Sequence, residues 1–342
     1  MKKNILIGLV IVLFVAVTLA GCSQDAPGTA PGDDNAALES DGRIPYSPDD
    51  HYIYVGCMWN LEYFIAHKLG WEYAGEVLGV KTSIMGPAEY DIPAMISAFE
   101  SAIAMEPKGI VTFAVDPELI PVINQAVDAG IPVVTLDGDQ PESKRLTFVG
   151  TNPYDAGYFG GMNLAQIIDE GEVAILTIVG VPMFVERERG YRDAMEKYSN
   201  GKLQIVAQGD TKADIPTGIS VAKSILAANP DLDAFVCVDS TGAISAATAI
   251  KEAGLEGEVA IIGMDRNNDV LEEIRNDVIT ASVAQQSALM PFYGLHVLFN
   301  YNYRHVPITD DNLAAGITGA PQFIYTGQIW VDDSNYEYFF SK

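Results

Sequence analysis

The chain has 342 residues, of which 49% are hydrophobic and 19% are charged. This is the composition of a globular protein, and the length exceeds what one hydrophobic core usually serves, so two lobes are expected. The formal net charge of −26 argues against partners such as nucleic acid or anionic lipid headgroups, which a surface this negative repels.

The first 22 residues have the pattern of an export signal. Lys2 and Lys3 precede an apolar run over residues 5–17, and small residues follow it. The run is short for a membrane-spanning helix, although an uncleaved signal anchor is the alternative. Removal of this segment leaves 18 basic and 46 acidic side chains, a formal charge of −28. The sequence "LAGC" resembles the lipobox of bacterial lipoproteins, and this resemblance implies that Cys22 becomes the lipidated first residue of the mature chain.

Residues 23–50 are rich in Pro, Gly, Ser, Asp and Ala and contain too few apolar side chains to offset the entropy of ordering. They are expected to form a flexible tether that holds a folded domain off a membrane. Two cysteines follow, Cys57 and Cys237, each within an apolar run. In an exported protein they can pair, but their positions favour two buried free thiols.

From residue 52 onward, short β-rich runs alternate with longer amphipathic stretches. The runs are continuously apolar rather than alternating in polarity, which is typical of strands covered on both faces in a parallel sheet. In chain order they occupy residues 52–57, 80–85, 109–115, 131–137, 146–150, 173–179, 203–208, 234–239, 259–265 and 279–284. Ten strands suit two sheets better than one.

Helical patterns fill the intervals between these runs. Leu69, Tyr73 and Val77 recur at i+4 and predict the apolar stripe of a first helix, and residues 95–103 and 119–127 contain similar stripes. The alternation predicts an α/β protein with two doubly wound, parallel-sheet lobes. No Walker A loop is present, and the glycines at 157–161 lack the spacing of a dinucleotide-binding motif, which disfavours nucleotide binding.

Polar and aromatic side chains collect where the predicted strands end, which is where doubly wound sheets bind ligands. They are Trp59, Asn60, Tyr63 and Phe64 after the first run, Asp137 and Asp139 after the fourth, Arg187 after the sixth, and Asp239, Asp265 and Gln285 at the ends of the last three. Carboxylates and carboxamides bond hydroxyls, arginine can bond two oxygens at once, and aromatic rings offer flat apolar faces. The set suits a small neutral polyol.

Each of these residues also has an ordinary structural interpretation. An aspartate at a strand end often caps the next helix, and Asp239 before Ser240 fits that role best. The aromatic residues can be helix-packing residues. In the "VERERGY" stretch, Glu186 and Glu188 suit a first helical turn, and Arg189 is expected on the surface.

The segments "YIYVGCMWNLEYF", "IPVVTLDGD", "VERERGY", "IIGMDRN" and "ITASVAQ", in this order and spacing, resemble the type I periplasmic sugar-binding proteins of the ribose- and galactose-binding group. The resemblance covers about residues 50–342. It implies that Tyr63 and Phe64, beside Trp59 and Asn60, sandwich a sugar ring. It also implies that hydroxyls are bound by the residues Asp137, Arg187, Asp239, Asp265 and Gln285.

The sequence departs from ribose binders at two of these positions. Ribose binders have an arginine where this chain has Gly138, and an asparagine where it has Asp239. The Asp-x-Asp pattern of Asp137 and Asp139 is more like the rhamnose and autoinducer-2 branches.

The topology of that family implies a hinge crossed three times by the chain. The crossings are expected near residues 151–153, near 285–286, and between Gly316 and the "PQFIYTGQIWV" segment. The first lobe is then 50–152 plus 287–318, and the second is 153–286 plus 319–342. A ligand that contacts both lobes would stabilise the closed arrangement, which a permease or a sensor would read.

The expected protein is thus a monomeric solute-binding lipoprotein outside the cytoplasm, which captures a small neutral sugar and presents it to an ABC permease. It would touch the membrane only through Cys22 and require no cofactor. The alternatives are a ligand-sensing lipoprotein serving a receptor or kinase and, less favoured, a secreted sugar hydrolase using paired carboxylates such as Asp137 and Asp265. No metal site is expected, because the four histidines are scattered, although the Asp137–Asp139 pair offers a weak calcium alternative.

Overall fold

The computed structural model describes residues 45–304, 306, 308–310, 312 and 314–340. The predicted export signal, the predicted lipidation site Cys22 and tether residues 23–44 lie outside the described residues.

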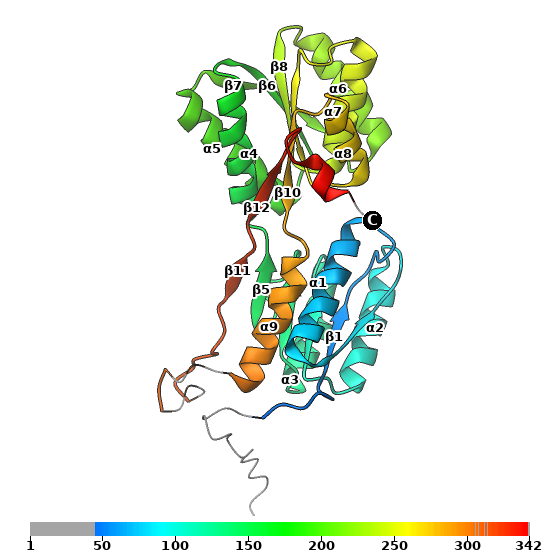
Figure 1. Ribbon diagram of the computed structural model, residues 1–342, viewed down its shortest axis with the longest axis vertical. Helices are drawn as coiled ribbons and strands as arrows, with labels where there is room; N and C mark the ends of the chain where they lie inside the picture. Colours follow the sequence, from blue (N-terminus) through cyan, green and yellow to red (C-terminus); the bar gives the residue numbers. More distant parts are fainter. Residues whose placement is uncertain (1–44, 305, 307, 311, 313, 341–342) are drawn as a thin grey trace, which may run out of the picture. The chain divides into compact units, whose positions relative to one another are not determined.

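The first lobe is built on a six-stranded sheet in the order β11-β5-β4-β3-β1-β2 (Figure 1). Its strands are β1 (His51–Val55), β2 (Lys81–Met85), β3 (Gly109–Thr112), β4 (Val133–Leu136), β5 (Thr147–Gly150) and β11 (Phe323–Tyr325). One face carries α1 (Tyr63–Leu78) and α9 (Leu289–Tyr303), and the other carries α2 (Ile92–Ala104), η1 (Pro117–Leu119) and α3 (Ile120–Asp128).

The second lobe repeats this arrangement with a sheet in the order β12-β10-β9-β8-β6-β7. Its strands are β6 (Gly171–Thr177), β7 (Leu203–Asp210), β8 (Leu232–Cys237), β9 (Ala260–Met264), β10 (Ala281–Gln285) and β12 (Gln328–Val331). One face carries α4 (Pro153–Ile167) and α5 (Pro182–Ser199), and the other carries α6 (Ile215–Ala228), α7 (Ser240–Ala253) and α8 (Asn268–Arg275). A short helix, η2 (Tyr336–Phe339), packs against α8.

The fold class predicted from the sequence is confirmed: both lobes are doubly wound. Each of the ten β-rich runs overlaps one of the strands β1 to β10, and all strand pairs are parallel except β12 with β10. In both sheets the first strand of the lobe lies between the second and the third, so the carboxyl ends of β1 and β3, and of β6 and β8, flank a topological switch point.

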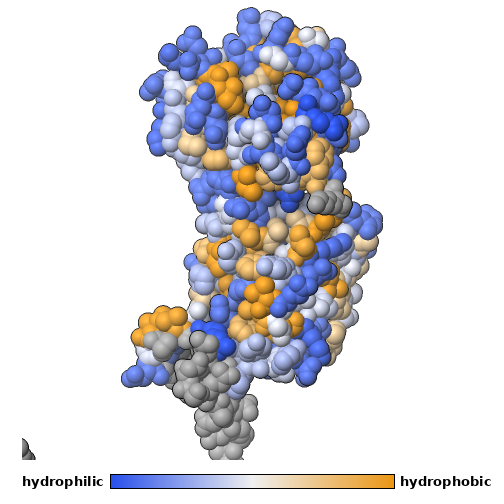
Figure 2. All heavy atoms as spheres, viewed as in Figure 1, coloured by the Kyte–Doolittle hydropathy of each residue, from blue (hydrophilic) through white to orange (hydrophobic). Residues whose placement is uncertain are grey.

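The helix predicted from Leu69, Tyr73 and Val77 is present as α1, but this apolar stripe does not face the core. Leu69, Tyr73 and Val77 are 63%, 56% and 53% exposed, whereas the buried face carries Phe64 and Trp71. Apolar residues on both faces made the pattern ambiguous, and the inner face also contains Gly70, where a Cβ atom would lie 1.9 Å from the carbonyl oxygen of Ala288. In Figure 2, apolar side chains accordingly interrupt the polar surface over α1 and α9.

The chain passes from the first sheet to the second after β5, returns after β10, and passes again after β11. The expectation that residues 319–342 lie wholly in the second lobe is therefore wrong for 319–325, because β11 pairs with β5. Arg145 explains the difference: it donates to the carbonyl of Gln322 at 3.2 Å and lies over the ring of Phe323. The three passages are bonded together, since Thr326 donates to the Gly150 carbonyl and Gln286 to the Thr326 carbonyl.

Each lobe has its own hydrophobic core. Cys57 belongs to the core of the first lobe, and Cys237 to a core of the second. Both are buried free thiols, as the sequence favoured, so no disulfide joins them.

Candidate functional site

Two aspartates occupy matching positions at the ends of the two sheets. Asp137 follows β4 and Asp265 follows β9, with φ angles of 62° and 69°. Their N–H groups bond the carbonyls of Val149 and Val283, on the next strand, at 3.0 and 2.9 Å. A left-handed backbone is costly for a residue other than glycine, and such strain is concentrated at functional sites. Each lobe thus holds one carboxylate at the carboxyl edge of its sheet.

Arg187 is fixed by close packing between α4 and α5. A Cβ atom on Gly157 would lie 1.9 Å from the carbonyl oxygen of Arg187, and one on Gly190 would lie 2.1 Å from that of Tyr154. The glycines therefore let the two helix backbones touch. The Arg187 side chain is 2% exposed and donates from one terminal nitrogen to the Val238 carbonyl at 2.8 Å. Its Nε is buried and has no hydrogen-bond partner among the described residues.

The hydroxyl of Tyr63, the first residue of α1, is a second buried polar group at this site. This hydroxyl lies near the Asp137 carboxylate, although it makes no hydrogen bond of normal geometry within the described part of the chain. Burial raises the pKa of Tyr63, and the charges of Asp137 and Asp265 add to this shift. Burial also raises the pKa of Asp137 to about 6; the Asp265 charge adds to this shift, and the nearby Tyr63 hydroxyl and Arg187 oppose it. These four side chains, from both lobes, are thus close enough to act on one another.

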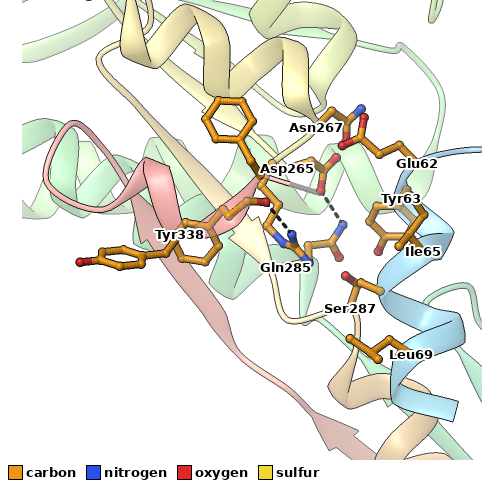
Figure 3. Close-up of a pocket in the computed structure, with 13 residues that line it drawn as sticks. Glu62, Tyr63, Ile65, Leu69, Asp265, Asn267, Gln285, Ser287 and Tyr338 are labelled. Atoms are coloured by element: carbon orange, nitrogen blue, oxygen red, sulfur yellow. Dashed lines mark hydrogen bonds between the residues drawn. The ribbon is translucent and has the colours of Figure 1, made fainter. Parts of the chain in front are cut away.

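Asp239 and Gln285 complete the group. Asp239 caps α7 by accepting from the Gly242 N–H at 3.0 Å, so its predicted structural role is confirmed. Burial raises the pKa of Asp239, with a further contribution from Asp265 that Arg187 opposes. Gln285 donates from Nε2 to an Asp265 oxygen at 3.0 Å, and the two side chains lie together in Figure 3. The structure therefore gathers Tyr63, Asp137, Arg187, Asp239, Asp265 and Gln285.

A cavity of about 380 Å³ adjoins this cluster (Figure 3). Its polar lining includes Asp265 and Gln285, whereas an apolar lining comes from α1 and from the C-terminal segment. The lining residues are Glu62, Tyr63, Ile65, Ala66 and Leu69 from the first lobe, Asp265, Arg266, Asn267, Gln285, Tyr338, Phe339 and Phe340 from the second, and Ser287 from the passage between them. The C-terminal aromatic residues were missed, although the "YEYFF" sequence at 336–340 was a visible signal.

Asp139 lies outside the cluster, contrary to the prediction. Its two carboxylate oxygens accept a bidentate pair from Arg145 at 2.5 and 2.6 Å, and Thr135 donates to one of them. Arg145 also contacts Gln322 and Phe323, so the ion pair helps to fix β11. This gives Asp139 a structural role.

The other predicted residues near β1 divide by burial. Trp59 packs against Tyr54 and Phe64 and donates its ring N–H to the Met85 carbonyl. Phe64 is 1% exposed, so both rings belong to the core beneath Tyr63. Asn60 is exposed and donates to Glu89 at 3.0 Å. Direct ligand contact by these three residues stays a prediction.

Among the residues that the structure describes, no group of three or more His, Cys, Asp or Glu is arranged to hold a metal ion. None of the helices in the described part of the chain is both long and apolar enough to cross a bilayer.

Comparison with known proteins finds the same architecture elsewhere. A family profile described as a periplasmic binding protein domain matches residues 59–302. The ribose import binding protein RbsB of Bacillus subtilis is 28% identical over 295 residues, covering 85% of this chain and 90% of that protein.

Two solved structures superpose with a TM-score of 0.81 each. One is AraP, an arabinose binding protein from Geobacillus stearothermophilus, 28% identical and covering 86% of this chain and 100% of that one. The other is the sugar-binding protein of a sugar ABC transporter from Bacillus halodurans, 30% identical and covering 85% of this chain and 100% of that one.

Proposed function

Because the chain belongs to the periplasmic binding protein domain family, we propose that it captures a small neutral sugar outside the cytoplasm and presents it to an ABC permease. The sugar binds between the two lobes and leaves unaltered. The protein is held at the membrane by a lipid on Cys22, at the end of the lipobox-like "LAGC" sequence.

The observation that carries this proposal is a pair of buried polar groups, neither of which makes a hydrogen bond of normal geometry to the described part of the chain, although the Tyr63 hydroxyl lies near Asp137. The Nε of Arg187 and the hydroxyl of Tyr63 are both buried beside Asp137, one from each lobe. Buried polar groups are normally hydrogen-bonded, so a ligand with hydroxyl groups is the natural partner. Ribose and arabinose, named for the B. subtilis and G. stearothermophilus relatives, are ligands of this kind.

The charges of the cluster favour a neutral ligand over an anionic one. Burial raises the pKa of Asp137 and of Asp239, the charge of Asp265 adds to both shifts, and Arg187 opposes both. Carboxylates need hydrogen-bond donors, which sugar hydroxyls supply, whereas a sugar acid or phosphate would add negative charge. Contacts to both lobes stabilise the closed arrangement, because the open one offers only half of them.

Calorimetry of the purified full-length chain against D-ribose, L-arabinose, D-allose, D-galactose and D-glucose tests the proposal. One site is expected for at least one sugar, with no product formed. Arg187→Ala should weaken that binding by about 2–3 kcal/mol, since charge-assisted hydrogen bonds are lost. Arg189→Ala is the matched control, because Arg189 is exposed and pairs with Glu186 on the surface. Equal losses in both variants, or turnover of the sugar, would contradict the proposal.

A further inference from the structure

A side chain of the first lobe reaches a helix of the second at the edge of the cavity. Glu62 immediately precedes α1, and its two carboxylate oxygens accept from the backbone N–H of Asn268, the first residue of α8, at 3.2 and 3.4 Å. Figure 3 shows Glu62 beside Asn267, which precedes α8. The contact therefore joins α1 directly to α8.

Helix α8 lacks a cap of its own. The first N–H groups of a helix have no partner within the helix, and a side chain from the preceding residue usually supplies one. Asp91, Asn152, Asp214 and Asp239 do so for α2, α4, α6 and α7. Asn267 makes no such bond for α8. Glu62 supplies the missing acceptor from the other lobe, where its negative charge also suits the helix N-terminus.

The position of α8 connects this contact to the binding cluster. The helix begins three residues after Asp265, so a bond that holds its first turn also holds the loop that carries that carboxylate. Arg266, in the same loop, donates to the Phe339 carbonyl at 3.3 Å and so links the loop to the C-terminal segment. Glu62 does not use its side chain to cap its own helix α1.

We propose that Glu62 is an interlobe latch, which caps α8 from across the cavity and favours the closed arrangement through α8 rather than through the sugar. The proposal rests on the proposed function only in that closure serves sugar binding. Separation of the lobes would break the bond, so the latch opposes opening and should slow ligand release. Glu62 is thus a positioning residue for the site.

The donor can be removed without touching the cavity. Asn268→Pro deletes the N–H that Glu62 accepts from, and proline is well tolerated at the first position of a helix. The preceding residue, Asn267, has φ −61° and ψ 151°, which is the conformation that a following proline requires. Glu62→Gln keeps an acceptor but removes the charge, and Glu62→Ala removes both. Glu72→Ala, on the exposed face of α1, is the control.

Stopped-flow measurement of D-ribose release and small-angle X-ray scattering without sugar test the latch separately from the proposed function. Glu62→Ala and Asn268→Pro should each speed release about fivefold, the effect of one helix cap, with little change in the association rate. The double variant should match either single one, and Glu62→Gln should lie between. Without sugar, both variants should scatter with a larger radius of gyration than the wild type and Glu72→Ala.

Two results would overturn the latch. One is an unchanged radius of gyration in Glu62→Ala and Asn268→Pro alike. The other is faster release in Glu62→Ala but not in Asn268→Pro, which would mean that Glu62 acts on the sugar directly. Failure of the wild type to bind D-ribose or any other sugar would count against the proposed function, while the scattering comparison would still decide on the latch.

Discussion

At the scale of single residues, two aspartates only two positions apart should have opposite effects on the free energy of unfolding. Burial and the like charge of Asp265 both disfavour the ionised form of Asp137 and raise its pKa. Asp139 instead holds Arg145 in a bidentate pair whose side chains are 18% and 5% exposed. Asp137 fits a ligand-binding residue whose buried charge lowers the stability of the folded protein. Asp139 fits a member of a structural ion pair.

Asp137→Asn should therefore stabilise the protein at neutral pH. The pKa of Asp137 rises from 3.8 to about 6 on folding, so the protonated form favours the folded state below pH 3.8 and that contribution is lost as the pH rises through 6. The substitution should raise the free energy of unfolding by about 1–3 kcal/mol at pH 7 and by little at pH 4. Urea unfolding at both pH values measures this, and calorimetry should show weaker sugar binding by the same variant.

Asp139→Asn is the paired experiment with the opposite expected sign. It leaves the nearly buried guanidinium of Arg145 without its charged partner, so the free energy of unfolding should fall by about 3 kcal/mol at pH 7. Stabilisation by this variant, or destabilisation by Asp137→Asn, would contradict the division of roles.

At the scale of helices and strands, the sequence predicted the strands better than the surfaces of the helices. Continuous apolar runs identified β1 to β10, because a strand covered on both faces has no polar side. Strands β11 and β12 were not predicted, because they have only three and four residues and are mostly only partly buried. The stripe of α1 was misassigned because both faces of that helix carry large apolar residues.

The candidate site was predictable to the extent that it depends on strand ends. Asp137, Asp265 and Gln285 were predicted from their positions at strand ends and from the family resemblance, since the carboxyl edge of such a sheet is where ligands bind. The ion pair of Asp139 with Arg145 was not anticipated, because Arg145 lies six residues on and gives no local pattern. The interlobe contact of Glu62 with Asn268 joins residues 206 positions apart, which no periodicity in the sequence records.

The α4–α5 contact makes a prediction at this scale, because glycines there set the position of Arg187. Gly157→Ala would place a Cβ atom 1.9 Å from the Arg187 carbonyl oxygen, so the helices must separate. The free energy of unfolding should fall by about 2–3 kcal/mol, and sugar affinity should fall at least tenfold as Arg187 shifts. Chemical denaturation and calorimetry measure the two effects.

Gly161→Ala, one turn further along the same helix, is the graded comparison. Its nearest contact would be 2.8 Å, to the Tyr191 backbone carbonyl oxygen, so the helices must also shift, but by less than in Gly157→Ala. Alanine is a better helix former than glycine, which offsets part of this cost. The free energy of unfolding and the sugar affinity should therefore both fall less than in Gly157→Ala. Equal losses of affinity in the two variants would mean that the contact does not position Arg187.

At the scale of the whole molecule, each lobe has a separate core and one buried thiol. Cys57 follows β1 in the first lobe, Cys237 ends β8 in the second, and both are 0% exposed. Burial raises the pKa of Cys57 to about 11 and also raises the pKa of Cys237. Neither thiol should therefore react until its own lobe unfolds locally and exposes it. The two cysteines therefore report separately on the opening of the two lobes.

A sugar held by both lobes should protect both cysteines together. Ligand at 100 times its Kd stabilises the binding-competent state by about 2.7 kcal/mol, so alkylation of Cys57 and of Cys237 should each slow up to about 100-fold. Mass spectrometry of the two cysteine peptides after timed alkylation, with and without sugar, measures this. Arg187→Ala should reduce the protection of both sites. Protection of Cys57 or Cys237 alone would mean that one lobe binds the sugar without the other, and closure of the two lobes would then have no energetic basis in the ligand.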